Sequence, residues 1–305
     1  MNALEKSLSL SICLISLVWV QTQANAQRAN ELPDAPVPLN ATDSAQTTAL
    51  PNLFGGFARN GDLAQTENPR VDNTTGVPQR EATWRSMPGD FIHDQKEMWT
   101  FPVRLFKGHS VLPTAIVLGT TVGLIYADPH VMPYFRSHAK NWDKPNDVFD
   151  PMITTGEVIA LPAGLLAAGY IRHDNREVNT ALLATEAYGD SVVINLAMKA
   201  ITRRKRPTDV PVGGDFGDTF FSGGKSPLHG SSFPSGHSMA VWSVATVVAE
   251  RYRHRGKPWI PILSYTLATA ISFSRITESA HFPSDVWLGA SLGYTIAKYQ
   301  TLSPR

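Results

Sequence analysis

Residues 274–285 read Ser-Arg-Ile-Thr-Glu-Ser-Ala-His-Phe-Pro-Ser-Asp and separate two long apolar runs. Proline is tolerated at the first position of a helix, so Pro283 predicts a helix that begins there. His281 then lies just before this helix and Asp285 lies in its first turn. The carboxylate can therefore hold one imidazole nitrogen and leave the other free to attack. By itself, a histidine near an aspartate at a helix start is more often a local capping arrangement.

A second feature of this stretch is Arg275, which ends the preceding apolar run. Its guanidinium is a planar fork of donors that suits a phosphate group. This stretch alone is more often structural, and its weight as a catalytic site depends on other clusters in the chain. Two further clusters complete the same set of groups.

The cluster that precedes this stretch most closely opens another helix, with the sequence Phe-Pro-Ser-Gly-His-Ser over residues 233–238. Free backbone N–H groups at a helix start form an anion site, and Gly236 allows a ligand to approach closely. His237 stands at the same position. Proline, serine and glycine before a helix are also ordinary capping residues, so this motif alone is moderate evidence.

The third cluster closes an earlier helix with Lys199, Arg203 and Arg206, followed by Pro207. The spacing is helical, so the three cations can share one face. Positive charge near a helix C-terminus is favourable for structural reasons alone, and for a single cluster that is the simpler interpretation.

Together the three clusters resemble the signature of the type 2 phosphatidic acid phosphatase (PAP2) superfamily, which includes bacterial class A acid phosphatases and vanadium haloperoxidases. The family pattern is Lys-x6-Arg-Pro, then Pro-Ser-Gly-His, then Ser-Arg-x5-His-x3-Asp. Every spacing is kept here, in Lys199…Arg206-Pro207, Pro234-Ser235-Gly236-His237 and Ser274-Arg275…His281…Asp285. The resemblance covers residues 180–300 closely and extends more loosely back to residue 110.

The resemblance implies a role for each matched residue. His281 is the nucleophile that forms a phosphohistidine, Asp285 orients it, and His237 is the general acid and then the base. The phosphoryl oxygens are neutralised by Lys199, Arg206 and Arg275, helped by the Ser235 side chain and the Gly236 N–H. No metal and no cofactor is implied. Arg203 lies outside the family pattern and is interpreted as a surface residue.

The leading hypothesis is therefore a metal-independent phosphatase, a phosphoric monoester hydrolase acting on phosphomonoesters or lipid phosphates. The alternative is a vanadium-dependent haloperoxidase, which uses the same cage for vanadate and is usually longer. An inactive structural bundle is disfavoured, because helix packing does not require this set of residues. A net charge of +1 gives no global basic field, so nucleic acid is not expected as a partner.

The fold predicted from the apolar pattern is all-α, a six-helix bundle. Apolar segments cover Leu112–Tyr126, Ile153–Tyr170, Thr180–Ile201, Ser238–Tyr252, Trp259–Phe273 and Val286–Tyr299. Each is long enough for a helix, and none alternates with period two. A short first helix is expected over Asp94–Phe106. Helix counting places two loops beside the site, Pro129–Pro151 with several aromatic residues and the glycine-rich Thr208–Ser232.

The front of the chain divides into two parts before the helical domain, which is expected over residues 96–305. Residues 1–26 match a secretory signal peptide, with Lys6, an apolar core and small residues before Gln27. The chain's only cysteine, Cys13, lies in that core, so no disulfide is expected after cleavage. Residues 27–95 are rich in Pro, Asn, Thr and Gly, and predict a low-complexity, disordered arm.

The signal peptide predicts export to the cell envelope, with the site facing the periplasm. Whether the helices span the membrane is less clear from the sequence. Several apolar runs are shorter than the ~20 residues that a bilayer requires, and Glu186 and Asp190 lie within one of them. Six spans counted from an exported Gln27 would also put the site on the inside. A soluble or peripheral bundle is slightly favoured over an integral one, with membrane association and a homo-oligomer left open.

Overall fold

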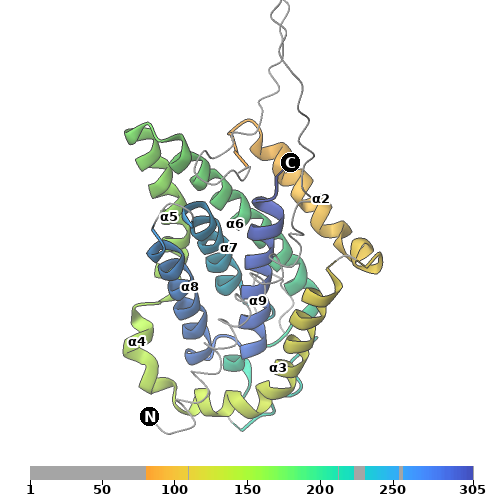
Figure 1. Ribbon diagram of the computed structural model, residues 1–305. Helices are drawn as coiled ribbons and strands as arrows, with labels where there is room; N and C mark the ends of the chain where they lie inside the picture. Colours follow the sequence, from red (N-terminus) through yellow and green to blue (C-terminus); the bar gives the residue numbers. More distant parts are fainter. Residues whose placement is uncertain (1–79, 109, 212, 223–230, 254–256, 305) are drawn as a thin grey trace, which may run out of the picture. The chain divides into compact units, whose positions relative to one another are not determined.

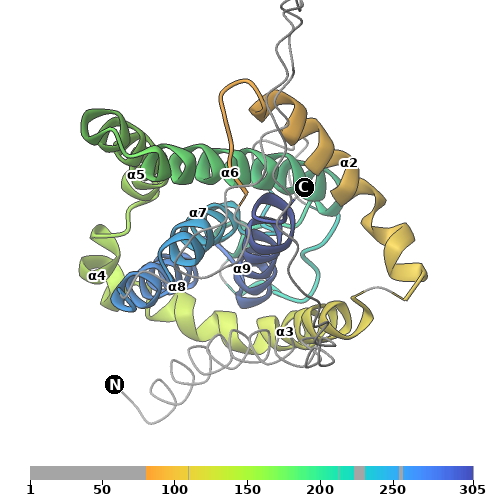
Figure 2. The same ribbon diagram turned by 45° about the horizontal axis from the view of Figure 1, so that its top comes forward.

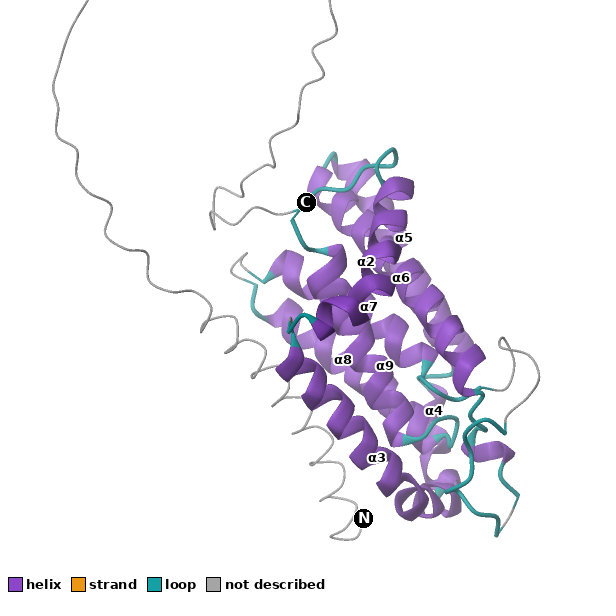
Figure 3. Ribbon diagram, turned by 90° about the vertical axis from the view of Figure 1, so that its right-hand side faces the viewer, coloured by secondary structure: helices purple, strands orange, loops and turns teal. Residues whose placement is uncertain are grey.

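The computed structural model describes residues 80–108, 110–211, 213–222, 231–253 and 257–304. Over these residues the ordered elements are helices, without a strand (Figure 3). The predicted all-α fold is therefore confirmed for this part of the chain. The predicted signal peptide, and the arm up to residue 79, lie outside the described residues.

The longer helices match the predicted apolar segments in order. They are α2 (Met87–Phe106), α3 (Val111–Ser137), α5 (Pro151–Arg172), α6 (Asn175–Thr202), α7 (Gly236–Tyr252), α8 (Trp259–Thr277) and α9 (Pro283–Ile296). Short elements lie between or after them: η1 (Ala139–Trp142), α4 (Asp143–Asp147), η2 (Pro207–Asp209) and the π-helical turn η3 (Ala297–Thr301). Side-chain caps set several of the starts. Asp150 accepts from the N–H of Met152 at 2.8 Å before α5, and Asp174 accepts from that of Arg176 at 2.9 Å before α6.

Helices α7 and α9 form the interior of this unit, whereas the first half of α8 is largely exposed. Helix α7 packs against α6, α8 and α9 (Figure 1). Seen from above, α7, α8 and α9 lie inside a ring made by α2, α3, α4, α5 and α6 (Figure 2). This arrangement places the ends of α6, α7, α8 and α9 that carry the three sequence motifs at one end of the helical unit.

Two glycines on α9 let it approach α7 closely. A Cβ atom on Gly289 would lie 2.5 Å from the carbonyl oxygen of Ser235, and one on Gly293 would lie 2.2 Å from that of Met239. No side chain fits at those distances, so glycine is required at both positions. The close approach brings the start of α9 against the start of α7, which are the segments that carry Asp285 and His237.

The ordered part of the chain begins earlier than predicted. Helix α2 starts at Met87 rather than at Asp94, and residues 80–86 also pack against the helical unit. Arg80 and Ala82 are buried, and the guanidinium of Arg80 binds the carboxylate of Glu186 at 2.8 Å. The sequence prediction failed here because the stability of this segment comes from buried ion pairs with distant residues, and not from local apolar periodicity.

The loop predicted over Pro129–Pro151 is mostly helical. Helix α3 continues through Pro129 and Pro133 to Ser137, and η1 and α4 follow it. Prolines in a polar stretch predict a loop, but a helix tolerates them when neighbouring elements hold it in place. Of the apolar side chains in this segment, Met132 and Phe135 are buried in the core.

Two described segments are long and apolar enough to cross a membrane. They are Val111–Ser137, with a mean hydropathy of 1.5, and Ala139–Arg172, with a mean hydropathy of 1.4. Only 11% and 22% of their apolar windows are buried, so neither is a core helix of the unit. Exposed large apolar side chains on α3 include Leu112, Val122 and Tyr126, and those on α5 include Met152 and Ile171.

Candidate functional site

Residues from all three motifs line one cavity of about 200 Å³. Its lining residues come from α5, α6 and α7, from Arg206 after α6, and from His281 in the loop that joins α8 to α9. Its polar lining includes Lys199, Arg206, Gly236, His237 and His281. The structure thus brings together groups that lie up to 82 residues apart in the sequence, from 199 to 281.

The imidazole of His281 is held by the segment before α7. Its Nδ1 lies 2.8 Å from the carbonyl oxygen of Ser232 and 3.3 Å from the Oγ of the same residue. A carbonyl oxygen only accepts, so Nδ1 carries the proton and Nε2 keeps its lone pair. The ring is 2% exposed and lines the cavity. The tautomer is therefore the one that a nucleophilic Nε2 requires.

The sequence predicted that the carboxylate of Asp285 holds one imidazole nitrogen of His281, and the structure corrects this contact. Its Oδ2 lies 3.6 Å from Nδ1 of His281, which is too far for a hydrogen bond. Oδ2 instead accepts from the Oγ of Ser232 and, at 2.8 Å, from the N–H of Phe282. Asp285 acts on the imidazole through its charge and through Ser232. The spacing of four residues predicted proximity correctly, but the N–H groups of the helix start compete for the carboxylate.

The second histidine is positioned by the first turn of α5. Nε2 of His237 lies 3.2 Å from Oγ1 of Thr155 and 3.3 Å from the carbonyl oxygen of Pro151. Thr155 donates its own hydroxyl proton to that same carbonyl at 2.7 Å. Both partners therefore accept from Nε2–H, and Nδ1 of His237 is left as the atom that can take or give a proton. Sequence reasoning missed Thr155, because nothing local links it to residue 237.

The basic cluster after α6 is not helical throughout, which corrects the predicted shared face. The helix ends at Thr202, and Arg203 has φ 43°, a left-handed conformation that terminates a helix. Arg206 reaches the cavity only because the chain turns back after that residue. Arg203 is exposed, in agreement with its interpretation as a surface residue.

The start of α7 lies directly against Lys199. A Cβ atom added to Gly236 would lie 3.3 Å from Nζ of Lys199 and 3.2 Å from Oδ1 of Asn195, so little space is left there for a side chain. Ser235 is buried, and its Oγ accepts from the hydroxyl of Ser238 at 3.0 Å. Unlike Gly236, Ser235 is not among the residues that line the cavity.

Arg275 is buried at the end of α8, and one of its two terminal guanidinium nitrogens, Nη2, is bound within the protein. Nη2 contacts the carbonyl oxygen of Phe149 and lies 2.9 Å from Oε1 of Glu278. Nη1 is buried and has no hydrogen-bond partner among the described residues. The Nε of Arg206 is in the same situation. A buried N–H without a partner costs free energy, so both groups are suited to an anion that supplies the acceptor.

The cavity is electropositive, and this shifts its titratable groups. Burial, and then the positive charge of Arg206, lower the pKa of Lys199 to about 8. Burial, and then the charges of Arg275 and His281, lower the pKa of His237 to about 4. Burial also lowers the pKa of His281, which keeps its imidazole neutral at pH 7. Repulsion between neighbouring positive groups is the common electrostatic cause that lowers the pKa values of Lys199 and His237.

The pKa of Lys199 predicts how anion binding depends on pH. Sulfate keeps its charge between pH 7 and 9, whereas Lys199 loses its proton as the pH rises through about 8. The dissociation constant of sulfate should therefore rise by up to about tenfold between pH 7 and pH 9. Isothermal titration measures it directly. In a Lys199→Arg variant the side chain stays charged, so the constant should be flat over this range. An equal rise in that variant would assign the titration to another group.

A buried network behind His281 was not predicted from the sequence. Arg204 donates to Oδ1 of Asp285 at 2.6 Å and to Oδ2 of Asp128 at 2.7 Å. Asp128 is the single acidic residue in the long apolar helix α3. A lone carboxylate in an apolar run is a signal for a buried partner, since such a charge is rarely buried unless it is paired. The sequence did not identify the partner.

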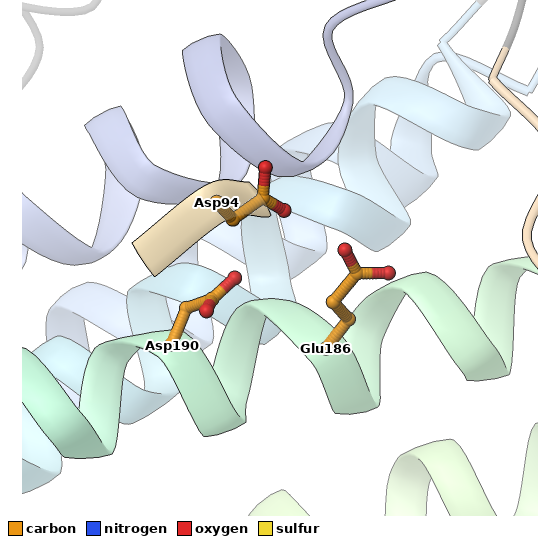
Figure 4. Close-up of side chains that lie close together, drawn as sticks. All are labelled: Asp94, Glu186 and Asp190. Carbon is orange, nitrogen blue, oxygen red and sulfur yellow. The ribbon is translucent and has the colours of Figure 1, made fainter. Parts of the chain in front are cut away.

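A separate group of carboxylates has the spacing of a cation site. Asp94 of α2 and Glu186 and Asp190 of α6 place carboxylate oxygens within 4.8 Å of one another (Figure 4). Arg80 already binds both oxygens of Glu186, at 2.8 and 3.1 Å, and Gln95 donates to Asp190 at 2.8 Å. None of the three carboxylates lines the cavity described above. The group therefore serves to join α2 to α6.

Comparison with known proteins agrees with the motifs. The model of the PAP2 superfamily matches residues 180–304. The lipid A 1-phosphatase of Porphyromonas gingivalis is 35% identical to this chain over 68 residues, which are 22% of this chain and 15% of that protein. The match thus covers a small part of that relative's length.

A solved structure is also similar to this chain. It is the crystal structure of the first transmembrane PAP2 type phosphatidylglycerolphosphate phosphatase from Bacillus subtilis. The sequences are 22% identical, the similarity covers 65% of this chain and 92% of the other, and the TM-score is 0.38.

Proposed function

We propose that this chain, whose residues 180–304 match the model of the PAP2 superfamily, is a metal-independent phosphatase that hydrolyses lipid phosphates. The observation that carries the proposal is the single cavity lined by Lys199, Arg206, Gly236, His237 and His281. The residues proposed as nucleophile and proton-transfer group line this volume together with two cations. The N-terminus of α7, which begins at Gly236, adds donors for an anion.

The reaction proceeds in two steps. Nε2 of His281 attacks phosphorus and the bond to the ester oxygen breaks. That oxygen takes a proton from Nδ1 of His237, which is protonated in the complex because the negative charge of the bound phosphate raises its pKa from the low value of the free site. The product of this step is an alcohol and a phosphohistidine at residue 281. His237, now neutral, accepts a proton from water as the water attacks phosphorus, which releases phosphate and restores the free imidazole.

The residues around the cavity can stabilise the charge that develops. Lys199 and Arg206 line the cavity, and Arg275 does not line it but acts on His237 through its charge. Buried N–H groups of both arginines have no partner among the described residues. Donors arranged in advance at a buried site need little reorganisation when the charge forms. These cations supply the positive charge that a metal ion supplies in other phosphatases, which is the basis for proposing a metal-independent reaction.

The apolar part of the cavity wall favours a lipid phosphate over a soluble phosphomonoester. Beyond the polar groups, the wall includes the apolar side chains of Val158, Val192, Leu196, Met239 and Ala240. An apolar wall next to a phosphate site suits the alkyl part of a lipid. The relative from P. gingivalis is named for activity on a lipid, which supports the same substrate class.

The exposed faces of α3 and α5 support association with the envelope membrane. Two of the three objections to a membrane-spanning bundle drawn from the sequence are weaker in the structure, and the third, the count of six spans, applies only if all six predicted segments cross the membrane. Helices α3 and α5 have 27 and 22 residues, which exceeds the predicted runs. Glu186 and Asp190 are buried, and their partners are Arg80, which precedes α2, and Gln95 of α2, so the two carboxylates do not face lipid. We propose that the chain associates with this membrane and that the site faces the periplasm.

A substrate panel tests the proposed function. Purified protein in detergent should release phosphate from phosphatidate or phosphatidylglycerolphosphate with a higher kcat/KM than from p-nitrophenyl phosphate. EDTA should leave the rate unchanged, and vanadate should inhibit competitively, because the cage accepts a five-coordinate phosphoryl group. A His281→Ala preparation is the control for contaminating phosphatases.

Two outcomes of this panel would count against the proposal. Loss of activity in EDTA would contradict the metal-independent reaction. Halogenation of a dye with vanadate and peroxide, without phosphate release, would point to the haloperoxidase that the sequence left as an alternative. No feature of the site favours that alternative over the phosphatase.

A further inference from the structure

Arg204 is the most completely enclosed cation near the site. It is 1% exposed and lies between the rings of Phe282 and Phe220, with its Cζ 3.8 and 4.4 Å from their centroids. Its Nε donates to Oγ1 of Thr219 at 3.1 Å. The rings exclude water from the faces of the guanidinium and set its plane, so its hydrogen bonds have a defined direction.

The guanidinium of Arg204 fixes the position of Asp285. Nη1 donates to Oδ1 of Asp285 at 2.6 Å, and the other oxygen accepts from Ser232 and from the N–H of Phe282. Both carboxylate oxygens are thus bound by groups other than His281. Because Ser232 also holds Nδ1 of His281, a shift of Asp285 would move the bond that orients the nucleophile.

A second carboxylate holds Arg204 from the opposite side. Oδ2 of Asp128, from α3, lies 2.7 Å from Nη2 of Arg204 and accepts from the hydroxyl of Ser284 at 2.5 Å. Ser284 in turn accepts from Nη1 of Arg204 at 2.7 Å. Two buried carboxylates therefore share one guanidinium, and removing that cation would leave both without their counterion.

We propose that Arg204, clamped by Asp128, is a positioning residue that holds Asp285 ionised and in place behind the nucleophilic His281. This inference rests on the proposed function, since it assigns Arg204 a part in the same reaction. Arg204 touches neither the substrate nor the reacting atoms. Its effect passes through Asp285, whose negative charge is needed when the phosphorylated imidazole, still carrying its Nδ1 proton, becomes positive.

Electrostatics agrees with this geometry. Burial alone would raise the pKa of Asp285, but the charges of Arg204 and His281 and the bond from Ser232 outweigh it, so the pKa lies below its usual range. Burial raises the pKa of Asp128, a carboxylate that shares the guanidinium of Arg204 with Asp285. Without Arg204, the balance at Asp285 would shift toward its protonated form.

The test compares substitutions at two adjacent arginines. Arg204→Gln keeps hydrogen-bonding capacity and removes the charge. Arg204→Lys keeps the charge and loses the planar guanidinium with its two terminal nitrogens. Arg203→Gln is the matched control, because Arg203 is exposed. We expect kcat with phosphatidate to fall by about 10–100-fold in Arg204→Gln, as for partners behind other functional histidines. In Arg204→Lys kcat should fall less than in Arg204→Gln, and in Arg203→Gln kcat should equal that of the wild type. The inhibition constant for phosphate should stay unchanged in all three.

The pH profile separates positioning from a purely structural role. In Arg204→Gln the acid limb of kcat should move to higher pH, because the pKa of Asp285 rises when its counterion is removed. Asp128→Asn keeps an acceptor for Arg204 and should have a milder effect than Arg204→Gln. A structural role would lower the melting temperature and leave the acid limb where it is. That result, or a larger loss in Asp128→Asn than in Arg204→Gln, would overturn the proposal.

A measurement without turnover keeps this inference separate from the proposed function. With aspartate labelled with 13C at Cγ, the carboxyl signal that disappears in Asp285→Asn reports the titration of Asp285. Its pKa should rise in Arg204→Gln and stay unchanged in Arg203→Gln. If the wild type releases no phosphate, the proposed function fails while this titration still decides the role of Arg204. An Asp285 titration that is identical in wild type and Arg204→Gln would refute the inference.

Discussion

A His281→Asn variant should lose about 10⁶-fold in kcat, the size of loss seen when the nucleophile is removed from another covalent hydrolase. Asparagine is close to histidine in size, and its side-chain amide can still donate to the carbonyl oxygen of Ser232, which now lies 2.8 Å from Nδ1. The variant should therefore fold normally and still bind phosphate. The loss would come from the absence of Nε2, the atom that the tautomer leaves free to attack.

The covalent intermediate can be observed directly in the same system. Rapid acid-free quench with 32P-labelled substrate should trap an acid-labile phosphohistidine, and peptide mapping should place it at residue 281. The label should accumulate in a His237→Ala variant, because loss of the base slows attack by water more than it slows phosphorylation by a substrate with a good leaving group. Label on another residue, or full activity in His281→Asn, would contradict the assignment of the nucleophile.

Arg275→Ala should cost about 2.7–4 kcal/mol of transition-state stabilisation, or about 10²–10³-fold in kcat/KM, as removal of an oxyanion donor does elsewhere. The expectation rests on Nη1 of Arg275, which is buried without a partner among the described residues, while Nη2 is tied to Phe149 and Glu278. Arg206→Ala should have a similar effect, since its Nε is in the same situation. Steady-state kinetics with a lipid phosphate measures both.

Arg203→Ala is the matched control for these two variants. Arg203 has the same charge and is three residues from Arg206, but it is exposed and follows the end of α6. It should change kcat/KM little. If Arg203→Ala were as harmful as Arg206→Ala, the general loss of positive charge near the cavity would explain the effect, and no specific contact with the phosphoryl group could be assigned.

The helix ends were predictable because their signals are local. Pro283 is the first residue of α9, and the pair Ser235-Gly236 caps and begins α7. Both signals determine the backbone conformation within one turn, so these helix starts can be identified in the sequence alone. Helix α3 shows where such signals fail. Pro129 and Pro133 predict a loop by local rules, whereas packing of Met132 and Phe135 in the core keeps the helix intact to Ser137.

The sequence by itself predicted the all-α fold, and it named five residues that the structure brings to one cavity: Lys199, Arg206, Gly236, His237 and His281. Three motifs at helix ends name Lys199, His237 and His281 without any knowledge of the arrangement in space. The tertiary structure alone decided which group holds each of them. Ser232 and not Asp285 binds Nδ1 of His281, and Thr155 holds His237 from α5.

The physical reason is that these partners are set by packing between segments far apart in the chain. Asp128 and Arg204 are 76 residues apart, and Arg204 and Asp285 are 81 residues apart. A motif specifies which residues lie at a helix end, because the backbone conformation there is determined locally. It does not record which distant carboxylate, hydroxyl or carbonyl completes a buried hydrogen-bond network. That choice depends on how α3, α6 and α9 pack together.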